Sequence, residues 1–281
     1  MYCKFLWFDV RQGLLRCWKK LLAACAVMLC LLLLHCLLIY THNTTLPPSE
    51  AALGFTTGDL LASVLCGIRP YDPVAQQPFL FPAIWLLFFL LLLYQVLLYP
   101  MENLNGIGQT MLMLSKSRRV WWLSKCSWCA LYVLVYFALF YALAALLTLA
   151  AGGEVTLALS SYYPSLWGVR NELQPPPWDT LPFFLLAPCI ACALALAQAT
   201  ATLWMRPIFA FFASCLYWLA SSYFLSPLLL GNYAMMQRIQ TMVSDGLPCL
   251  SGLVSAALLC VCCLALGCWR SARMDILTFD Y

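Results

Sequence analysis

Long apolar runs alternate with short polar connections along most of this chain. A helix that crosses a bilayer needs roughly twenty apolar residues. Six stretches reach that length, at about 21–40, 79–99, 122–150, 181–205, 207–230 and 248–269. The third run is long, which predicts a helix that is tilted or projects beyond the bilayer. Little more than Arg206-Pro207 separates the fourth from the fifth. The pattern predicts an all-α integral membrane protein in which residues 21–269 form one six-helix transmembrane domain.

Two short segments flank this domain. Residues 1–20 mix Phe5, Phe8 and Trp18 with basic side chains, which predicts an amphipathic helix in the membrane interface. The first apolar run is longer than the apolar region of a cleaved signal peptide, so we expect it to remain as the first span. Residues 270–281 form a short tail after the last run.

The positions of the basic residues predict the orientation. Of the fifteen Lys and Arg residues, twelve belong to the N-terminal segment, the connections after the second and fourth runs, and the tail. The other three connections contain one each: Arg69, Arg170 and Arg238. Basic residues are enriched in cytoplasmic loops. We therefore expect a multi-pass protein of the plasma membrane with both termini in the cytoplasm.

Composition narrows the function classes. The chain is 64% hydrophobic and 9% charged, whereas a soluble domain carries roughly 25% charged residues. The net charge of +4 lies in separate clusters, which argues against nucleic-acid binding. The central parts of the predicted spans contain no Asp, Glu, Lys or Arg. Since ion-coupled transporters usually carry such groups inside the membrane, this absence argues against a secondary transporter.

The few polar residues inside the spans are expected to be structural. Gln95 and Gln198 are predicted to form hydrogen bonds between helices, and His35 is expected to be hydrogen-bonded near the interface rather than to bind ligand. No HExxH, GxSxG or Walker-type motif is present. The sequence therefore predicts no catalytic residue, no bound cofactor and no metal site in this chain.

The sixteen cysteines are most simply packing residues, because most lie in apolar runs or basic stretches. The CxxC spacings at Cys126 and Cys189 have no second pair or histidine nearby, so a metal or redox role is the weaker interpretation. Cys66 and Cys249 are expected to face the outside, so a disulfide bond between them stays an open alternative.

The connection after the second run carries the most informative pattern. Apolar residues recur there at spacings of three and four, which predicts a short amphipathic helix: Leu104, Ile107, Met111 and Leu114. A basic turn follows, and Trp121-Trp122 is expected to anchor the next span at the interface. The segment is either a basic loop on anionic lipid or a docking element for a cytoplasmic partner.

The arrangement resembles the permease subunits of type-2 ATP-binding-cassette exporters. At the level of residues, the resemblance is carried by Tyr99-Pro-Met-Glu-Asn-Leu-Asn-Gly-Ile-Gly-Gln-Thr, by Ser115-Lys-Ser-Arg-Arg-Val-Trp-Trp-Leu-Ser-Lys and by Arg273-Met-Asp-Ile-Leu. These permeases have an N-terminal interfacial helix, six spans, and a cytoplasmic coupling helix between spans two and three. ATP and Mg are bound by a separate ATPase subunit.

The resemblance implies partners and contact residues. A cytoplasmic ATPase would dock on the connection after span two, through Glu102, Asn103, Gly106, Gln109, Lys116, Arg118 and Arg119. A second permease chain, identical or related, would complete the substrate pathway as a homodimer or heterodimer, surrounded by membrane lipid. The alternative is a non-transport membrane scaffold or assembly factor that docks a cytoplasmic protein.

Overall fold

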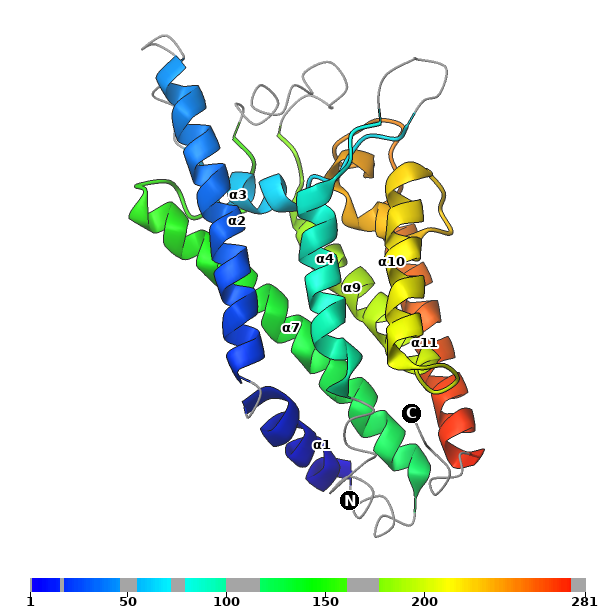
Figure 1. Cartoon of the computed structure of the whole chain (residues 1–281). Coiled ribbons are helices and arrows are strands. Elements are labelled where there is room, and N and C mark those ends of the chain that lie inside the picture. Colours follow the sequence, from blue (N-terminus) through cyan, green and yellow to red (C-terminus); the bar gives the residue numbers. More distant parts are fainter. Residues whose placement is uncertain are drawn as a thin grey trace.

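Six apolar helices form the bundle and run alternately between its two ends (Figure 1). The computed structural model describes residues 2–15, 18–45, 55–71, 79–99, 117–160 and 177–273, and every regular element in these ranges is a helix. The six are α2 (Trp18–Thr45), α4 (Ala83–Leu97), α7 (Arg118–Ala150), α9 (Leu181–Ala201), α10 (Pro207–Tyr223) and α11 (Cys249–Arg273). The prediction of an all-α membrane protein is confirmed at this level.

Short elements mark the two ends. The lower end in Figure 1 carries α1 (Tyr2–Val10), the start of α7 and the end of α11. The upper end carries α3 (Thr57–Leu65) and two 3₁₀ turns, η3 (Leu230–Ala234) and η4 (Met236–Arg238). The first and last described helices therefore reach the same end of the bundle.

Four helices are long and apolar enough to cross a membrane: Trp18–Thr41 within α2, α7, α9 and α11. Helices α4 and α10 are shorter than the predicted runs at 79–99 and 207–230, at 15 and 17 residues. At 1.5 Å per residue they measure about 22 and 26 Å, below the roughly 30 Å of a hydrocarbon core. Prolines explain the difference, since Pro82 precedes α4 and Pro227 follows the extended residue Phe224 at the end of α10.

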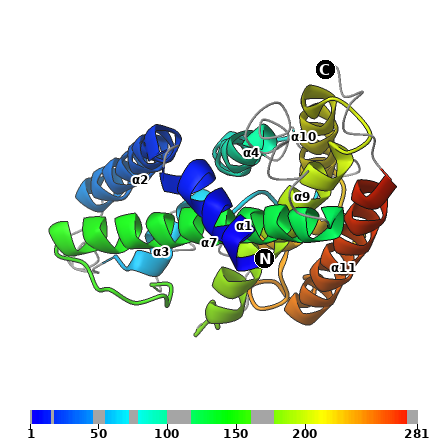
Figure 2. The same cartoon turned by 90° about the horizontal axis from the view of Figure 1, so that it is seen from below.

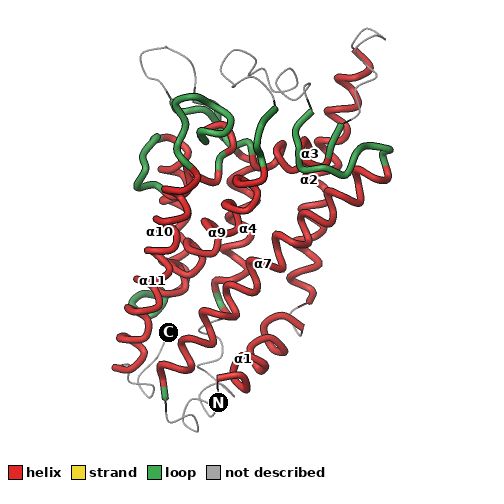
Figure 3. The backbone as a smooth tube through the Cα atoms, turned by 180° about the vertical axis from the view of Figure 1, so that it is seen from behind, coloured by secondary structure: helices red, strands yellow, loops and turns green. Residues whose placement is uncertain are grey.

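Helix α7 is the longest element, with 33 residues. It begins at Arg118, four residues before the predicted span, and measures about 50 Å. It crosses the bundle obliquely, as Figures 1 and 3 show, with α1 packed against it at the lower end (Figure 2). This length exceeds the roughly 30 Å of a hydrocarbon core, and a helix that long tilts or projects beyond the bilayer.

The described residues of the segment 1–20 belong to three helical elements. Helix α1 ends at Val10, a π-helical turn η1 (Arg11–Leu15) follows, and α2 already begins at Trp18. Gly13 lies in this turn, and a Cβ atom there would come within 2.6 Å of both Trp128 and Tyr99. The missing side chain therefore lets the backbone of the turn approach α7 closely.

Aromatic side chains fill the centre of the bundle. Trp218 of α10 stacks on Phe89 of α4 with 4.3 Å between ring centroids, and Trp85 lies edge-on to Trp218 at 4.9 Å. The indole nitrogen of Trp85 donates to the carbonyl of Ala234 at 2.8 Å. This packing buries Trp85.

Two further tryptophans are buried near the start of α7: Trp121 and Trp122, which the sequence predicts to anchor this span at the interface. Trp122 packs against Gly267 of α11, where a Cβ atom would lie 2.0 Å from the indole nitrogen. Trp204 and Trp269, by contrast, are exposed. Contacts among α1, α7 and α11 therefore cover side chains that a single span would leave facing lipid.

A buried arginine organises the upper end. Arg238 donates to the carbonyls of Ile68, Ser221 and Ser222 at 2.6–2.8 Å and also to the side chain of Asn232. Ser221 and Ser222 lie in the last turn of α10, where carbonyls lack helical partners and a positive charge is favourable. Burial lowers the pKa of Arg238 to about 10, so the guanidinium stays charged at neutral pH.

Candidate functional site

A buried ion pair joins α1 to α7 at the lower end. The Nζ atom of Lys125 lies 2.5 Å from Oδ1 of Asp9, and the two side chains are 3% and 2% exposed. Burial of single charges is costly, so opposite charges brought together here stabilise one another. The pair fixes the end of α1 on the first turns of α7.

Two hydroxyl groups complete this cluster. The Tyr99 hydroxyl donates to both Oδ1 and the carbonyl oxygen of Asp9 at 3.0 Å. The Ser124 hydroxyl donates to Oδ2 at 2.5 Å. The Lys125 ammonium lies 4.6 Å from the centre of the Tyr99 ring, within the range of a cation–π contact. We call Asp9, Tyr99, Ser124 and Lys125 the lower cluster.

The lower cluster borders both sides of the predicted docking segment. Tyr99 follows α4 directly, while Ser124 and Lys125 lie in the first two turns of α7. Of the predicted docking residues, Arg118 and Arg119 begin α7, and Arg119 is exposed. The others lie outside the described residues: Glu102, Asn103, Gly106, Gln109 and Lys116. Both ends of the segment are thus tied to α1 through a single carboxylate.

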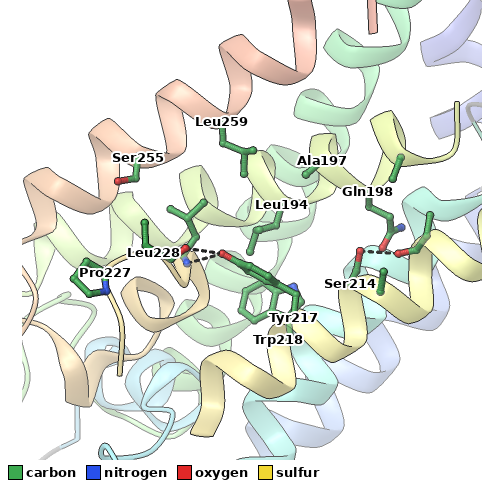
Figure 4. Close-up of a pocket in the computed structure, with 14 residues that line it drawn as sticks. Leu194, Ala197, Gln198, Ser214, Tyr217, Trp218, Pro227, Leu228, Ser255 and Leu259 are labelled. Atoms are coloured by element: carbon green, nitrogen blue, oxygen red, sulfur yellow. Dashed lines mark hydrogen bonds between the residues drawn. The ribbon is translucent and has the colours of Figure 1, made fainter. Parts of the chain in front are cut away.

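The second feature is a cavity of about 410 Å³ between α9, α10 and α11 (Figure 4). Helices α10 and α11 each pack against α9 and η3, with few contacts joining them directly. Small side chains line the facing surfaces of α9 and α10: Ala197, Ala201, Ala210 and Ala213. Four leucines, Trp218 and Pro227 complete the apolar part of the wall. The space arises because alanines stand where larger side chains would fill the gap.

The polar groups of the cavity are spread along its length. Gln198 and Ser214 lie at one end, the Tyr217 hydroxyl lies near the middle, and Ser255 lies toward the other end (Figure 4). Tyr217 donates to the carbonyl of Leu228 at 3.1 Å and accepts from the amide of Leu230 at 2.8 Å. Its hydrogen-bonding capacity is therefore used in holding the 228–230 segment against α10.

Only one of the two polar atoms of the Gln198 amide has a hydrogen-bond partner among the described residues. Its Nε2 donates to the carbonyl of Leu93 on α4 at 2.9 Å, whereas Oε1 has no hydrogen-bond partner among the described residues. The side chain is 2% exposed. A carbonyl can only accept, so the nitrogen is the atom that meets Leu93, and the oxygen is left unpaired. Trp218 also lines the cavity with its buried indole nitrogen unpartnered within the described chain.

The predicted interhelical roles of the polar span residues are confirmed. Gln198 of α9 bonds α4, and the Tyr132 hydroxyl of α7 donates to Oε1 of Gln95 on α4. Nδ1 of His35 lies 2.8 Å from the carbonyl of Leu31, and His35 is buried. The glutamine contacts connect neighbouring helices, and the His35 contact lies within one turn of its own helix. Both are expected for polar groups in apolar surroundings.

The cysteines are free thiols wherever they are described, including Cys66 and Cys249, which were the pair left open for a bridge. Burial raises the pKa of the Cys66 thiol to about 12. The Cys192 thiol of α9 lies close to the Cys260 thiol of α11. This contact joins two helices that also pack extensively elsewhere.

Sequence reasoning missed the lower cluster. Lys125 was assigned to a basic loop, and Asp9 was not singled out within a basic segment. One signal was present: Asp9 is the only acidic residue among the first 49. A lone carboxylate in an interfacial, basic helix needs a specific partner, but only the packing of α1 on α7 identifies it.

Comparison with known proteins yields no matching family model, no matching curated protein and no matching solved structure.

Proposed function

We propose that this chain is the membrane-spanning permease subunit of an ATP-driven exporter. It forms the substrate pathway together with a second permease chain, and a separate cytoplasmic subunit binds and hydrolyses ATP. The alternating direction of six apolar helices supports a six-span arrangement, in which α4 and α10 cross the membrane together with their flanking residues. Both ends of the chain then lie in the cytoplasm.

The lower cluster is the observation that carries this proposal. An external ATPase drives a permease only if its movement reaches the spanning helices. Asp9 bonds Tyr99 on one side of residues 100–116 and Lys125 on the other, both through buried contacts. A displacement of this segment would therefore move α4, α7 and α1 together, as in rigid-body switching. A segment that only lay on lipid would not need such a connection.

A pull-down from native membranes tests the proposal. The intact chain is extracted in mild detergent, and co-purifying proteins are identified by mass spectrometry. The variant carries Glu102→Ala, Arg118→Ala and Arg119→Ala. We expect an ATPase with the wild type and its loss with the variant. A matched control has the same net change in charge at exposed residues elsewhere: Glu154→Ala, Arg206→Ala and Arg273→Ala.

The outcomes separate the candidate functions. An ATPase that binds the wild type and both variants equally keeps the exporter but removes these contact residues. A different cytoplasmic protein, with no ATPase, would establish the scaffold function in place of transport. Recovery of no partner from native membranes would contradict both.

The topology has an independent test. Single-cysteine chains, built on a cysteine-free background, carry the thiol at residue 4 or residue 273. Intact cells are treated with a membrane-impermeant maleimide. We expect labelling of both positions only after permeabilisation, and labelling of either one in intact cells would contradict cytoplasmic termini.

A further inference from the structure

We infer that the cavity between α9, α10 and α11 binds a single-chain amphiphile, with an apolar chain along the cavity and a hydrogen-bond donor against Gln198. Binding is measured without transport, so the site stands independently of the proposed exporter function. The occupant is defined by the walls of the cavity, by its surroundings and by one unpaired acceptor.

The walls require an apolar body. Leu194, Leu228, Leu230 and Leu259 line the cavity together with the four alanines. An apolar cavity of this kind gains little from water and accepts apolar molecules. Filling it restores the packing contacts that the alanines leave unmade. A chain of methylene groups fits these requirements, because each buried methylene contributes about 0.8 kcal/mol.

The surroundings supply such a chain. Ala213 and Leu228 are exposed although they line the cavity, which places an opening on the outer surface. Leu216 of α10 and Leu258 of α11 are 52% and 62% exposed on the same two helices. Since these helices lie in the bilayer, an amphiphile can enter sideways from the lipid.

One end of the cavity requires a donor. Gln198 offers an unpaired Oε1, and the only hydroxyl proton of Ser214 is already given to the carbonyl of Ala210 at 2.9 Å. Both side chains can therefore accept a further hydrogen bond. In lipid no water is present to satisfy a buried amide oxygen, and an unpaired one is costly. A ligand whose polar end is a hydroxyl or an amide N–H removes this cost.

The test uses three ligands and purified full-length chain in detergent. A long-chain alcohol with a diazirine near its apolar end labels the site on illumination, and labelled peptides are mapped by mass spectrometry. Dodecanol and dodecyl methyl ether compete with it; they share the same chain, but only the alcohol donates. We expect labels on α9, α10 and α11, and dodecanol competing about tenfold better than the ether.

Two variants make the result specific. Ala213→Phe fills the cavity and is expected to abolish labelling, whereas Ala142→Phe, on an exposed position of α7, leaves it unchanged. Gln198→Leu removes the acceptor and is expected to equalise the alcohol and the ether without loss of labelling. Each variant is first checked for a single symmetric peak in size-exclusion chromatography.

Several results would overturn the inference. Labelling of Ala213→Phe at the wild-type level would exclude the cavity as the site. Equal competition by alcohol and ether in the wild type would exclude the donor at Gln198. Lipid analysis then identifies the source: a resident membrane lipid is retained by the purified wild type and lost from Ala213→Phe, while a transient cargo is retained by neither.

Discussion

Asp9 and Lys125 are 116 residues apart in the sequence, yet Oδ1 of one lies 2.5 Å from Nζ of the other in a buried contact. The pair joins the end of α1 to the start of α7. Ser124 and Tyr99 donate to the same carboxylate, so four polar side chains satisfy one another. The relationship makes α1 a part of the bundle rather than a helix that only lies on lipid.

Removal of one partner of this pair should be strongly destabilising. Lys125→Met leaves the Asp9 carboxylate buried without a cation, and the expected loss is about 3–5 kcal/mol. Asp9→Leu combined with Lys125→Met should recover part of it, because no buried charge remains. Thermal unfolding in mild detergent measures both. Lys19→Met, at an exposed basic position, is the control; equal destabilisation by Lys19→Met and Lys125→Met would contradict the prediction.

Arg238→Lys should destabilise the upper end although the charge is retained. The guanidinium bonds carbonyls of two segments at once, at Ile68 and at the end of α10, and a single ammonium group cannot match that planar geometry. We expect a loss of about 2–4 kcal/mol, since hydrogen bonds to charged groups contribute about 1.5–3 kcal/mol each. Arg206→Lys, at an exposed position, should leave the unfolding temperature unchanged. An unchanged unfolding temperature for Arg238→Lys would show that the carbonyl contacts of Arg238 are dispensable.

Gly267→Ala should force α11 away from α7. The added Cβ would lie 2.0 Å from the indole nitrogen of Trp122, and overpacking of this kind costs about 1–3 kcal/mol. Trp122→Phe introduced with it should recover stability, because the smaller ring gives room. Ala265→Val adds volume on an exposed face of the same helix and serves as the control. An unchanged unfolding temperature for Gly267→Ala would refute this close approach.

Oxidation should link α9 to α11 through Cys192 and Cys260, whose thiols lie close together. Copper phenanthroline is the oxidant, and two thiols lose two electrons and two protons to form the disulfide. Mass spectrometry of proteolysed chain should detect the linked peptides. Cys189 is exposed on α9 and provides the internal comparison; cross-linking of Cys189 to Cys260 in preference to Cys192 would contradict the arrangement of these helices.

Stability should depend on pH through Asp59, at the first turn of α3. Burial raises the pKa of its carboxyl above the ordinary 3.8, although hydrogen bonds from Thr56 and Ser160 offset part of the effect. The folded state thus favours the protonated acid. Its contribution to stability is complete below the ordinary pKa and is lost as pH rises through the raised pKa.

The measurement for Asp59 is the change in unfolding temperature between pH 4 and pH 7. Asp59→Asn cannot titrate, so its curve should fall less steeply with rising pH than that of the wild type. The variant is expected to unfold at a lower temperature than the wild type at both pH 4 and pH 7, because an amide replaces the capping-box carboxylate. Parallel curves would show that Asp59 does not contribute to the pH dependence.

The sequence by itself determined the class of the protein and the positions of its main helices. Apolar runs of span length specify helices in lipid, because backbone groups must be satisfied within the segment. The hydrogen bonds of Gln95 and Gln198 followed from the cost of isolated polar groups. Helix ends near Pro82 and Pro227 were less accurate, because a hydropathy pattern continues beyond the residue at which a helix stops.

Only the tertiary structure decided which side chains meet. The Asp9–Lys125 pair joins residues far apart in sequence, and neither the charge pattern nor the periodicity of α1 identifies its partner. Trp122 is buried because Gly267 on a distant helix admits it, so its burial is a property of two helices together. The cavity likewise exists because α10 and α11 both pack on α9. Local patterns specify elements, whereas the contacts between elements depend on their relative position and orientation.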